Sequence, residues 1–127
     1  MDIITFLTAG VWVANRKITQ YQDIIPSGED IPLGELSYIF SPNYSLIINE
    51  KGLQKKGTYA IDLKDYLDGK GHPKVIIDIN NRQYNWILTT SRFTLKTDSE
   101  GNLISGNMFL TRYDGDWSYA LLFYLKK

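Results

Sequence analysis

The side chains most often used in catalysis are scarce in this sequence. Its 127 residues include one His and no Cys, which excludes thiol nucleophiles and thiolate metal sites. The single histidine, His72, stands between Gly71 and Pro73 in a polar stretch, and no Gly-x-Ser-x-Gly motif supplies a nucleophilic serine. We therefore interpret His72 as a surface histidine.

The acidic residues form no catalytic or metal-binding motif. Residues 98–102 (DSEGN) are too short for an EF-hand calcium loop, and residues 114–116 (DGD) are typical of a turn. A carboxylate pair such as Asp62 and Asp65 could act as acid and base only inside a cleft. We predict that the protein is not an enzyme and has no catalytic residue, metal ion or cofactor.

Aromatic side chains are more informative, because Phe, Trp and Tyr make up 13% of the chain. Tyrosine and tryptophan combine an apolar body with one polar group, which suits them to lining a small-molecule pocket. Arg16 alternates onto the same face as Trp12 and Ile18, where it could pair with a ligand carboxylate, although such an arginine also often extends into solvent or pairs with an acidic residue. The predicted ligand-binding residues are Arg16, Tyr38, Tyr59, Tyr84 and Trp86.

These residues must be positioned by strands, because apolar and polar residues alternate with a period of two along the whole chain. The alternation is clearest in residues 58–63, 74–79 and 92–96. Other segments are rich in β-branched and aromatic residues, which favour strands: residues 11–21, 36–41, 44–49, 83–89, 106–113 and 117–126.

Short connections rich in Gly, Asn and Asp separate these segments, and such connections join antiparallel neighbours. Of two longer connections, residues 22–35 cannot form a regular helix and residues 64–73 could hold one helical turn. We predict one all-β domain over residues 1–127: an antiparallel up-and-down β-barrel of about eight or nine strands with a short N-terminal helix. A two-sheet sandwich is the alternative.

Several short motifs resemble the small bacterial lipocalin-like domains of the calycin group. Residues 7–12 (LTAGVW) are similar to the Gly-x-Trp at the entry to the first strand of that family. Residues 38–45 (YIFSPNYS) resemble its aromatic hairpin, residues 57–62 (GTYAID) its Gly-x-Tyr strand, and residues 86–88 (WIL) and 93–95 (FTL) its later strands.

The resemblance implies a barrel closed at one end by an arginine over a tryptophan. Arg112 resembles the family's arginine near the end of a late strand, which would place it over Trp12 in a cation–π contact. The chain lacks the cysteines and long C-terminal helix of secreted lipocalins. It also lacks the helix pair and the C-terminal Arg-x-Tyr of intracellular fatty-acid-binding proteins, so fatty-acid binding is not implied.

The balance of acidic and basic residues restricts the classes of partner that we expect this protein to bind. The 14 basic and 14 acidic residues give a formal net charge of zero, which argues against nucleic acid. No segment is long enough to span a membrane. Asp2 stands where a secretory leader has basic residues, so we expect a cytoplasmic protein as written, or a periplasmic or exported one if a leader was removed.

We predict a lipocalin-like binding module for a small apolar or amphipathic ligand. The alternative is a protein-binding module with a filled barrel, such as an immunity-type inhibitor of a toxin or enzyme, which would use residues 22–35 and 64–73. Interior volume distinguishes them: an apolar void of about 300 Å³ or more supports the ligand, and a filled core with an exposed aromatic patch supports the protein partner.

Overall fold

The chain folds into a strand-rich structure with two short helices in its described part. The computed structural model describes residues 2–21, 27–30, 35–91 and 94–126. Its elements in chain order are α1 (Ile3–Leu7), β1 (Val11–Tyr21), β2 (Ser27–Asp30), β3 (Leu36–Phe40), β4 (Ser45–Glu50), β5 (Leu53–Asp62), α2 (Lys64–Leu67), β6 (Lys74–Ile79), β7 (Arg82–Thr89), β8 (Lys96–Thr97), β9 (Leu103–Ser105), β10 (Asn107–Asp114) and β11 (Trp117–Lys126).

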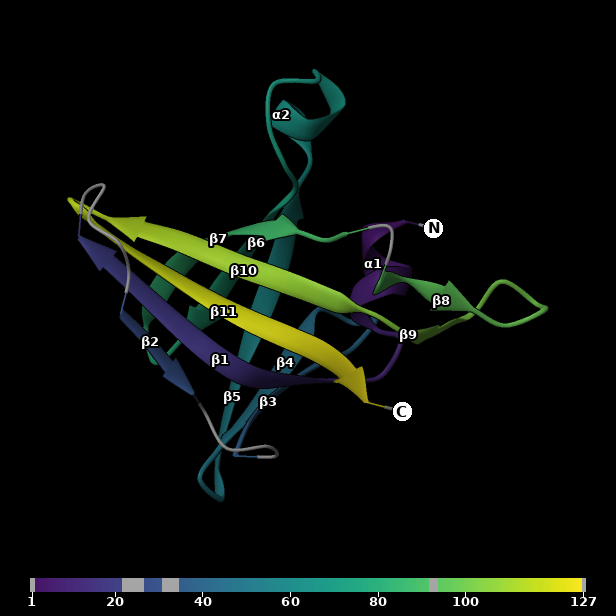
Figure 1. The fold of residues 1–127 in the computed structure, drawn as a ribbon, viewed down its shortest axis with the longest axis horizontal. Helices are drawn as coiled ribbons and strands as arrows, with labels where there is room; N and C mark the ends of the chain where they lie inside the picture. Colours follow the sequence, from purple (N-terminus) through teal and green to yellow (C-terminus); the bar gives the residue numbers. More distant parts are fainter. Residues whose placement is uncertain (1, 22–26, 31–34, 92–93, 127) are drawn as a thin grey trace.

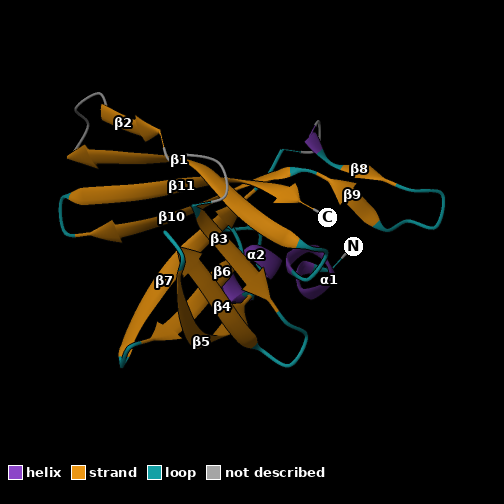
Figure 2. Ribbon diagram, turned by 90° about the horizontal axis from the view of Figure 1, so that it is seen from below, coloured by secondary structure: helices purple, strands orange, loops and turns teal. Residues whose placement is uncertain are grey.

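Eight of these strands close into an antiparallel barrel, which confirms the predicted fold. Each strand pairs with the next barrel strand along the chain in the order β1, β3, β4, β5, β6, β7, β10 and β11, and β11 pairs back with β1. The additional strand β2 pairs with the outer half of β1, and β8 pairs with β9 in a separate hairpin (Figures 1 and 2).

Tight turns between neighbouring strands depend on residues that tolerate positive φ. Lys51 and Gly52 connect β4 to β5 at φ 50° and 80°, and Asn80 and Asn81 connect β6 to β7 at φ 53° and 62°. Two consecutive left-handed residues form the turn whose twist matches that of a β-hairpin. These turns agree with the sequence prediction, and they place Glu50 and Asn80 at the same end of the barrel.

Helix α1 covers the opposite end. Asp2 caps it by accepting a hydrogen bond from the Thr5 amide at 2.7 Å, a common N-cap arrangement. Phe6 and Leu7 are buried, and the Trp12 indole Nε1 donates to the Leu7 carbonyl at 3.0 Å. The Trp12 ring lies 4.9 Å from the Phe6 ring, so helix and first strand form one packed end.

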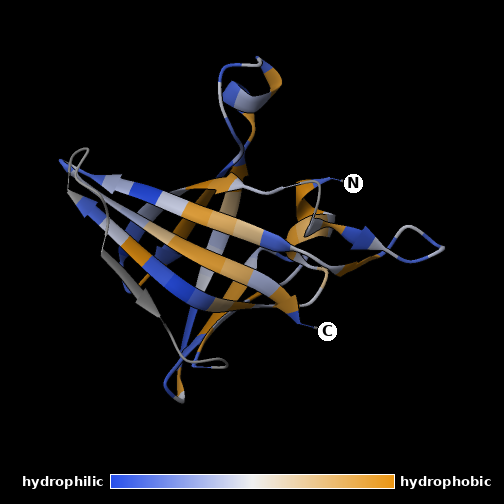
Figure 3. Ribbon diagram, in the orientation of Figure 1, coloured by the Kyte–Doolittle hydropathy of each residue, from blue (hydrophilic) through white to orange (hydrophobic). Residues whose placement is uncertain are grey.

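The core fills the α1 end and the middle of the barrel. Figure 3 shows apolar residues along the middle of β10 and β11 and hydrophilic residues where β1 and β10 reach past the other strands. The Tyr38 ring meets Phe123 edge-on at 4.9 Å, and the Phe40 ring meets Tyr59 edge-on at 5.0 Å. The largest fully buried side chains are Trp12, Phe123, Leu7, Leu46, Ile77, Leu103, Met108, Leu110 and Val75.

The prediction of a barrel strand at residues 92–96 is wrong for the part of it that the structure describes. Positions 92–93 lie outside the described residues. The Thr94 amide bonds to the Ser91 carbonyl at 3.1 Å in a turn, and β8 begins only at Lys96 and pairs with β9. Leu95 still packs against the core, so the alternation there reflects a partly buried connection.

Replacing Trp12 with Ala should strongly destabilise the protein. The side chain is fully buried, and its removal leaves a cavity and an unpaired Leu7 carbonyl, which together should cost about 3 to 5 kcal/mol. Urea unfolding followed by circular dichroism measures this loss. Trp117→Ala is the control, because Trp117 is 45% exposed and its loss should cost less than half as much. Equal losses in both variants would contradict a central role for Trp12.

Candidate functional site

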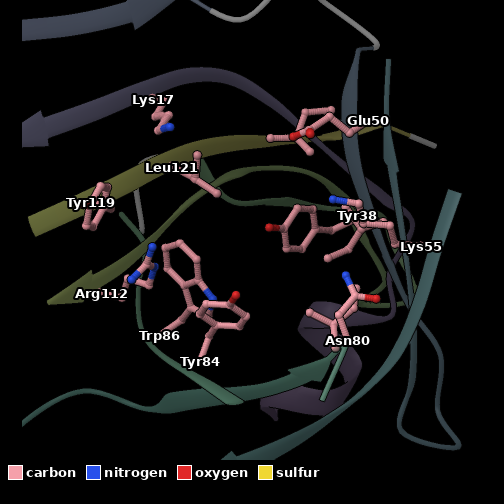
Figure 4. A pocket seen from close by; sticks show the side chains of 13 residues that line it. Lys17, Tyr38, Glu50, Lys55, Asn80, Tyr84, Trp86, Arg112, Tyr119 and Leu121 are labelled. Carbon is pink, nitrogen blue, oxygen red and sulfur yellow. The ribbon is translucent and has the colours of Figure 1, made fainter. Parts of the chain in front are cut away.

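A cavity of about 320 Å³ opens at the end of the barrel opposite α1. It lies inside the mouth, at the level of the β4–β5 and β6–β7 hairpins, and Figure 4 shows its walls. Its volume is at the lower end of the range typical of small-molecule sites. Its lining residues are Lys17, Leu36, Tyr38, Ile48, Glu50, Lys55, Ile79, Asn80, Tyr84, Trp86, Arg112, Tyr119 and Leu121.

The cavity exists because two seams of the barrel are short. β3 pairs with β1 only where Tyr38 and Ser37 face Trp12 and Val13. β7 pairs with β10 only from Ile87 to Thr89. Past these seams β1, β10 and β11 continue as a projecting sheet (Figure 2). Side chains on the two walls therefore do not meet across the mouth as they do in the core.

A β-bulge in β1 determines which of two basic side chains, Arg16 or Lys17, points into the cavity. Ala14 pairs with Phe123 and Arg16 pairs with Leu122, so Asn15 is an extra residue in the ladder. An extra residue reverses the alternation of faces beyond it. Arg16 is consequently exposed on the outer face, and the expectation that it shares the face of Trp12 is wrong. Lys17 lines the cavity instead.

Arg112 also lies in the cavity, where three aromatic rings surround it. Its guanidinium carbon is 4.4 Å from the centre of the Tyr119 ring, 5.3 Å from that of Tyr84 and 5.5 Å from that of Trp86. Each distance is within the range of a cation–π interaction. Tyr119 is the direct cross-strand neighbour of Arg112, so the barrel ladder itself builds one side of this cluster.

The expected contact of Arg112 with Trp12 is wrong. Arg112 is level with Tyr119, which pairs with Thr19, and Thr19 is seven residues further along β1 than Trp12. At about 3.3 Å per residue, this puts the two side chains roughly 20 Å apart along the strand. Trp12 closes the α1 end, and Arg112 belongs to the mouth.

Tyr38 contributes a hydroxyl group to the cavity. Its side chain is 7% exposed, and Figure 4 shows its oxygen directed into the space between Leu121 and the Arg112 cluster. Among the described residues no side chain or backbone group forms a hydrogen bond with this hydroxyl. Burial raises the pKa of Tyr38 above its ordinary value, and the Glu50 carboxylate adds to the rise while Arg112 opposes it. The hydroxyl is therefore a protonated donor at neutral pH.

Tyr84 and Trp86 line the cavity as predicted, but Tyr59 does not. Tyr59 donates its hydroxyl hydrogen to the Ser41 carbonyl at 2.6 Å and packs against Phe40 and Tyr44. The strand alternation correctly turned Tyr59 inward. Its position along β5 places it beside the β3–β4 turn, away from the mouth.

The cavity has more positive than negative groups. Among the residues that the structure describes, Lys17, Lys55 and Arg112 line it together with one carboxylate, that of Glu50. The ion pair formed within the described part of the chain is elsewhere, between Lys74 and Asp65 at 3.2 Å. The mouth thus combines apolar walls with cations that form no ion pair with any carboxylate of the described residues.

Several lining residues were missed by the sequence prediction, and one had a usable signal. Met108, Leu110 and Arg112 alternate along β10, and because Leu110 faces Leu88, the next inward pair is Arg112 with Trp86. Alternation along β10 could therefore have turned Arg112 inward, but only the observed register places it beside Trp86. Nothing in the sequence marks Lys17, because the bulge that turns it inward has no signature there.

Other features of the described residues add no second built site. A groove of about 550 Å³ near α1 is lined by residues including Phe6, His72 and Leu95, but Thr90 and Leu95 in its wall flank positions 92–93, outside the described residues. Within the described ranges, no group of three or more His, Cys, Asp or Glu side chains could hold a metal ion. Neither described helix has the length and hydrophobicity that a membrane crossing requires.

Comparisons with known proteins show little similarity. No protein-family model matches the chain, and no curated protein matches it. Among solved structures, the chain is similar to a crystal structure of an LTBP1 point mutant in complex with leukotriene C4, with a TM-score of 0.48 and 12% sequence identity over 98% of this chain and 70% of that chain. Similarity at this level says nothing about a ligand or activity of the present protein.

The raised pKa of Tyr38 predicts a specific loss of stability in alkali. A tyrosine whose pKa is higher in the folded than in the unfolded state keeps its proton longer when folded. The native state then binds more protons above the unfolded pKa of about 10, so the free energy of unfolding falls as pH rises. Tyr38 should contribute at most about 1.4 kcal/mol per pH unit.

Urea unfolding at pH 9, 10 and 11 tests this effect in the wild type, in Tyr38→Phe and in the exposed control Tyr113→Phe. Burial also raises the pKa of Tyr59, which is unchanged in all three proteins, so the comparison isolates Tyr38. Tyr38→Phe should lose less stability between pH 9 and 11 than the other two. Parallel pH profiles would show that folding does not raise the pKa of Tyr38.

Proposed function

We propose that this protein is a non-catalytic, lipocalin-like binding protein that takes up a small apolar or amphipathic ligand at the open end of its barrel. The observation that carries the proposal is the cavity of about 320 Å³, whose wall combines aromatic and aliphatic side chains with charged and polar ones. Concave, largely pre-formed sites of this kind with a few polar groups are typical of small-molecule binding.

Binding would be driven by transfer of apolar surface from water to the cavity wall. Leu36, Ile48 and Leu121 present aliphatic surface, and burial of each ligand methylene group contributes about 0.8 kcal/mol. Tyr38, Tyr84 and Trp86 add aromatic surface with polar groups that can fix the orientation of the ligand.

The packed α1 end supports this function by holding the cavity in shape. Tyr38 is wedged against Phe123 in the core, and Leu121 continues the same inward face of β11. A wall built on a rigid core loses little conformational entropy when a ligand binds.

Binding to another protein is the second candidate, and the loop of α2 favours it. Figure 1 shows this loop standing away from the barrel. Tyr66 and Leu67 on it are 48% and 74% exposed, and exposed aromatic and aliphatic groups often anchor interfaces. An immunity-type inhibitor would dock through such a loop. The hollow mouth favours the ligand, because the protein-binding alternative requires no cavity.

Titration with N-phenyl-1-naphthylamine, an uncharged apolar fluorophore, tests the proposal. We expect a saturable fluorescence increase with one bound molecule per chain. Ile79→Glu should weaken binding about tenfold or more, because it places a charge on the cavity wall where the ligand excludes water.

The matched control is Ile104→Glu, which makes the same change at a residue of β9 that is 45% exposed. It should bind the fluorophore as the wild type does. Absence of saturable binding by the wild type, or equal weakening by both substitutions, would refute the ligand site. Native mass spectrometry of the purified chain would then show whether a protein partner accompanies it.

A further inference from the structure

Arg112 is an unusual cation to find on the wall of a cavity. In the described part of the chain, no carboxylate oxygen lies within the 4.0 Å that defines an ion pair with its guanidinium. Its charge is instead stabilised by the faces of Tyr119, Tyr84 and Trp86. Among the described residues no oxygen accepts a hydrogen bond from its N–H groups, so these donors stay available for a ligand acceptor.

The rings also fix the position of the guanidinium before any ligand arrives. Tyr84 and Trp86 come from β7 and Tyr119 from β11, on either side of β10, which carries Arg112. An arginine held in this way has already lost much of its rotamer freedom. Its planar fork of donors is matched by carboxylate and phosphate oxygens, which accept two parallel hydrogen bonds.

Tyr38 supplies a second donor directed into the same space. Tyr38 is 7% exposed as a residue, its oxygen faces the cavity (Figure 4), and the hydroxyl has no hydrogen-bond partner among the described residues. Because this oxygen is not one of the fully buried unpaired atoms, it is accessible from the cavity, where a ligand oxygen could accept its hydrogen bond. The hydroxyl hydrogen is therefore available to an acceptor on the ligand.

The charged side chains around the cavity also favour an anionic group on the ligand. Among the described lining residues, Lys17 and Lys55 add two positive charges to that of Arg112, and Glu50 subtracts one. A cationic ligand would meet this excess and find a single carboxylate among these residues. A neutral ligand would form no ion pair with the charged side chains of the mouth.

We propose that the ligand is an amphiphile with an anionic head group, a carboxylate or a phosphate, and that Arg112 and the Tyr38 hydroxyl bind this head group while the aliphatic wall binds the tail. This inference rests on the proposed function and specifies its ligand class. It replaces Arg16, which the sequence favoured for the anion, with an arginine on the inner face of β10.

Four probes with the same ten-carbon tail test the head-group preference: decanoate, decyl phosphate, decanol and decyltrimethylammonium. Each displaces N-phenyl-1-naphthylamine from the wild-type protein at pH 7.5, below its micelle concentration. Decanoate or decyl phosphate should bind at least about tenfold more tightly than decanol, since hydrogen bonds to a charged group supply that difference. The tighter of the two identifies the head group.

Variants then assign the preference to residues. Arg112→Gln should bring the ratio of anion to decanol affinity close to one. Arg16→Gln removes the same charge from the outer face and should keep the wild-type ratio. Tyr38→Phe, which removes only one oxygen from a packed side chain, should lower the ratio about threefold or more even if Arg112→Gln fails to fold.

The outcomes separate the two proposals. If decanol or the ammonium probe binds as tightly as the anions, the anion inference is wrong and the ligand-binding function stands. If Arg16→Gln lowers the ratio as much as Arg112→Gln, net charge explains the preference and Arg112 is not the anion site. If the fluorophore does not bind at all, the binding function fails and the inference fails with it.

Discussion

Closure of the barrel depends on β1, which pairs with three other strands. It pairs with β11 from Val11 to Tyr21, with β3 at only two positions, and with β2 along its outer half. The bulge at Asn15 lies between the part that meets β3 and the part that meets β2. Before the bulge, β1 contributes Trp12 and Ala14 to a dry core; after it, β1 contributes Lys17 to a polar mouth. One inserted residue thus divides the interior into two chemical environments.

Much of the fold was predictable, because the strands bury one face and the turns require particular residues. The boundaries of β1, β6 and β11 agree with the alternation, and Asn80 and Gly52 adopt the left-handed backbone that their types favour. The short strand β2 was not predicted because residues 27–30 (SGED) have no strand propensity; they pair because β1 offers an open edge. Residues 92–96 show the reverse case, where alternation in five residues reflects burial without pairing in the barrel.

The site was less predictable, since it depends on distance along the strands as well as on faces. Alternation correctly turned Tyr38, Tyr59, Tyr84 and Trp86 inward, but it could not tell which end of the barrel each would reach. Because of the bulge, Lys17 lines the cavity in the place predicted for Arg16, and Arg16 lies on the outer face. Arg112 illustrates a different error: family resemblance assigned it to Trp12, whereas the ladder puts it among Tyr84, Trp86 and Tyr119. At this position the motif suggested by the resemblance was less reliable than the strand register along β10.

The pairing of β1 with β11 also determines when the barrel can close during synthesis. Val11 meets Lys126, so contacts that close the ring join segments from opposite ends of the described chain, and such non-local contacts slow folding. During synthesis on a ribosome, β1 through β10 can form a curled sheet, but its two outer edges stay unpaired until β11 emerges. Exposed edges invite pairing with other chains. Pairing of β11 therefore converts an aggregation-prone open sheet into a barrel whose strand edges are paired.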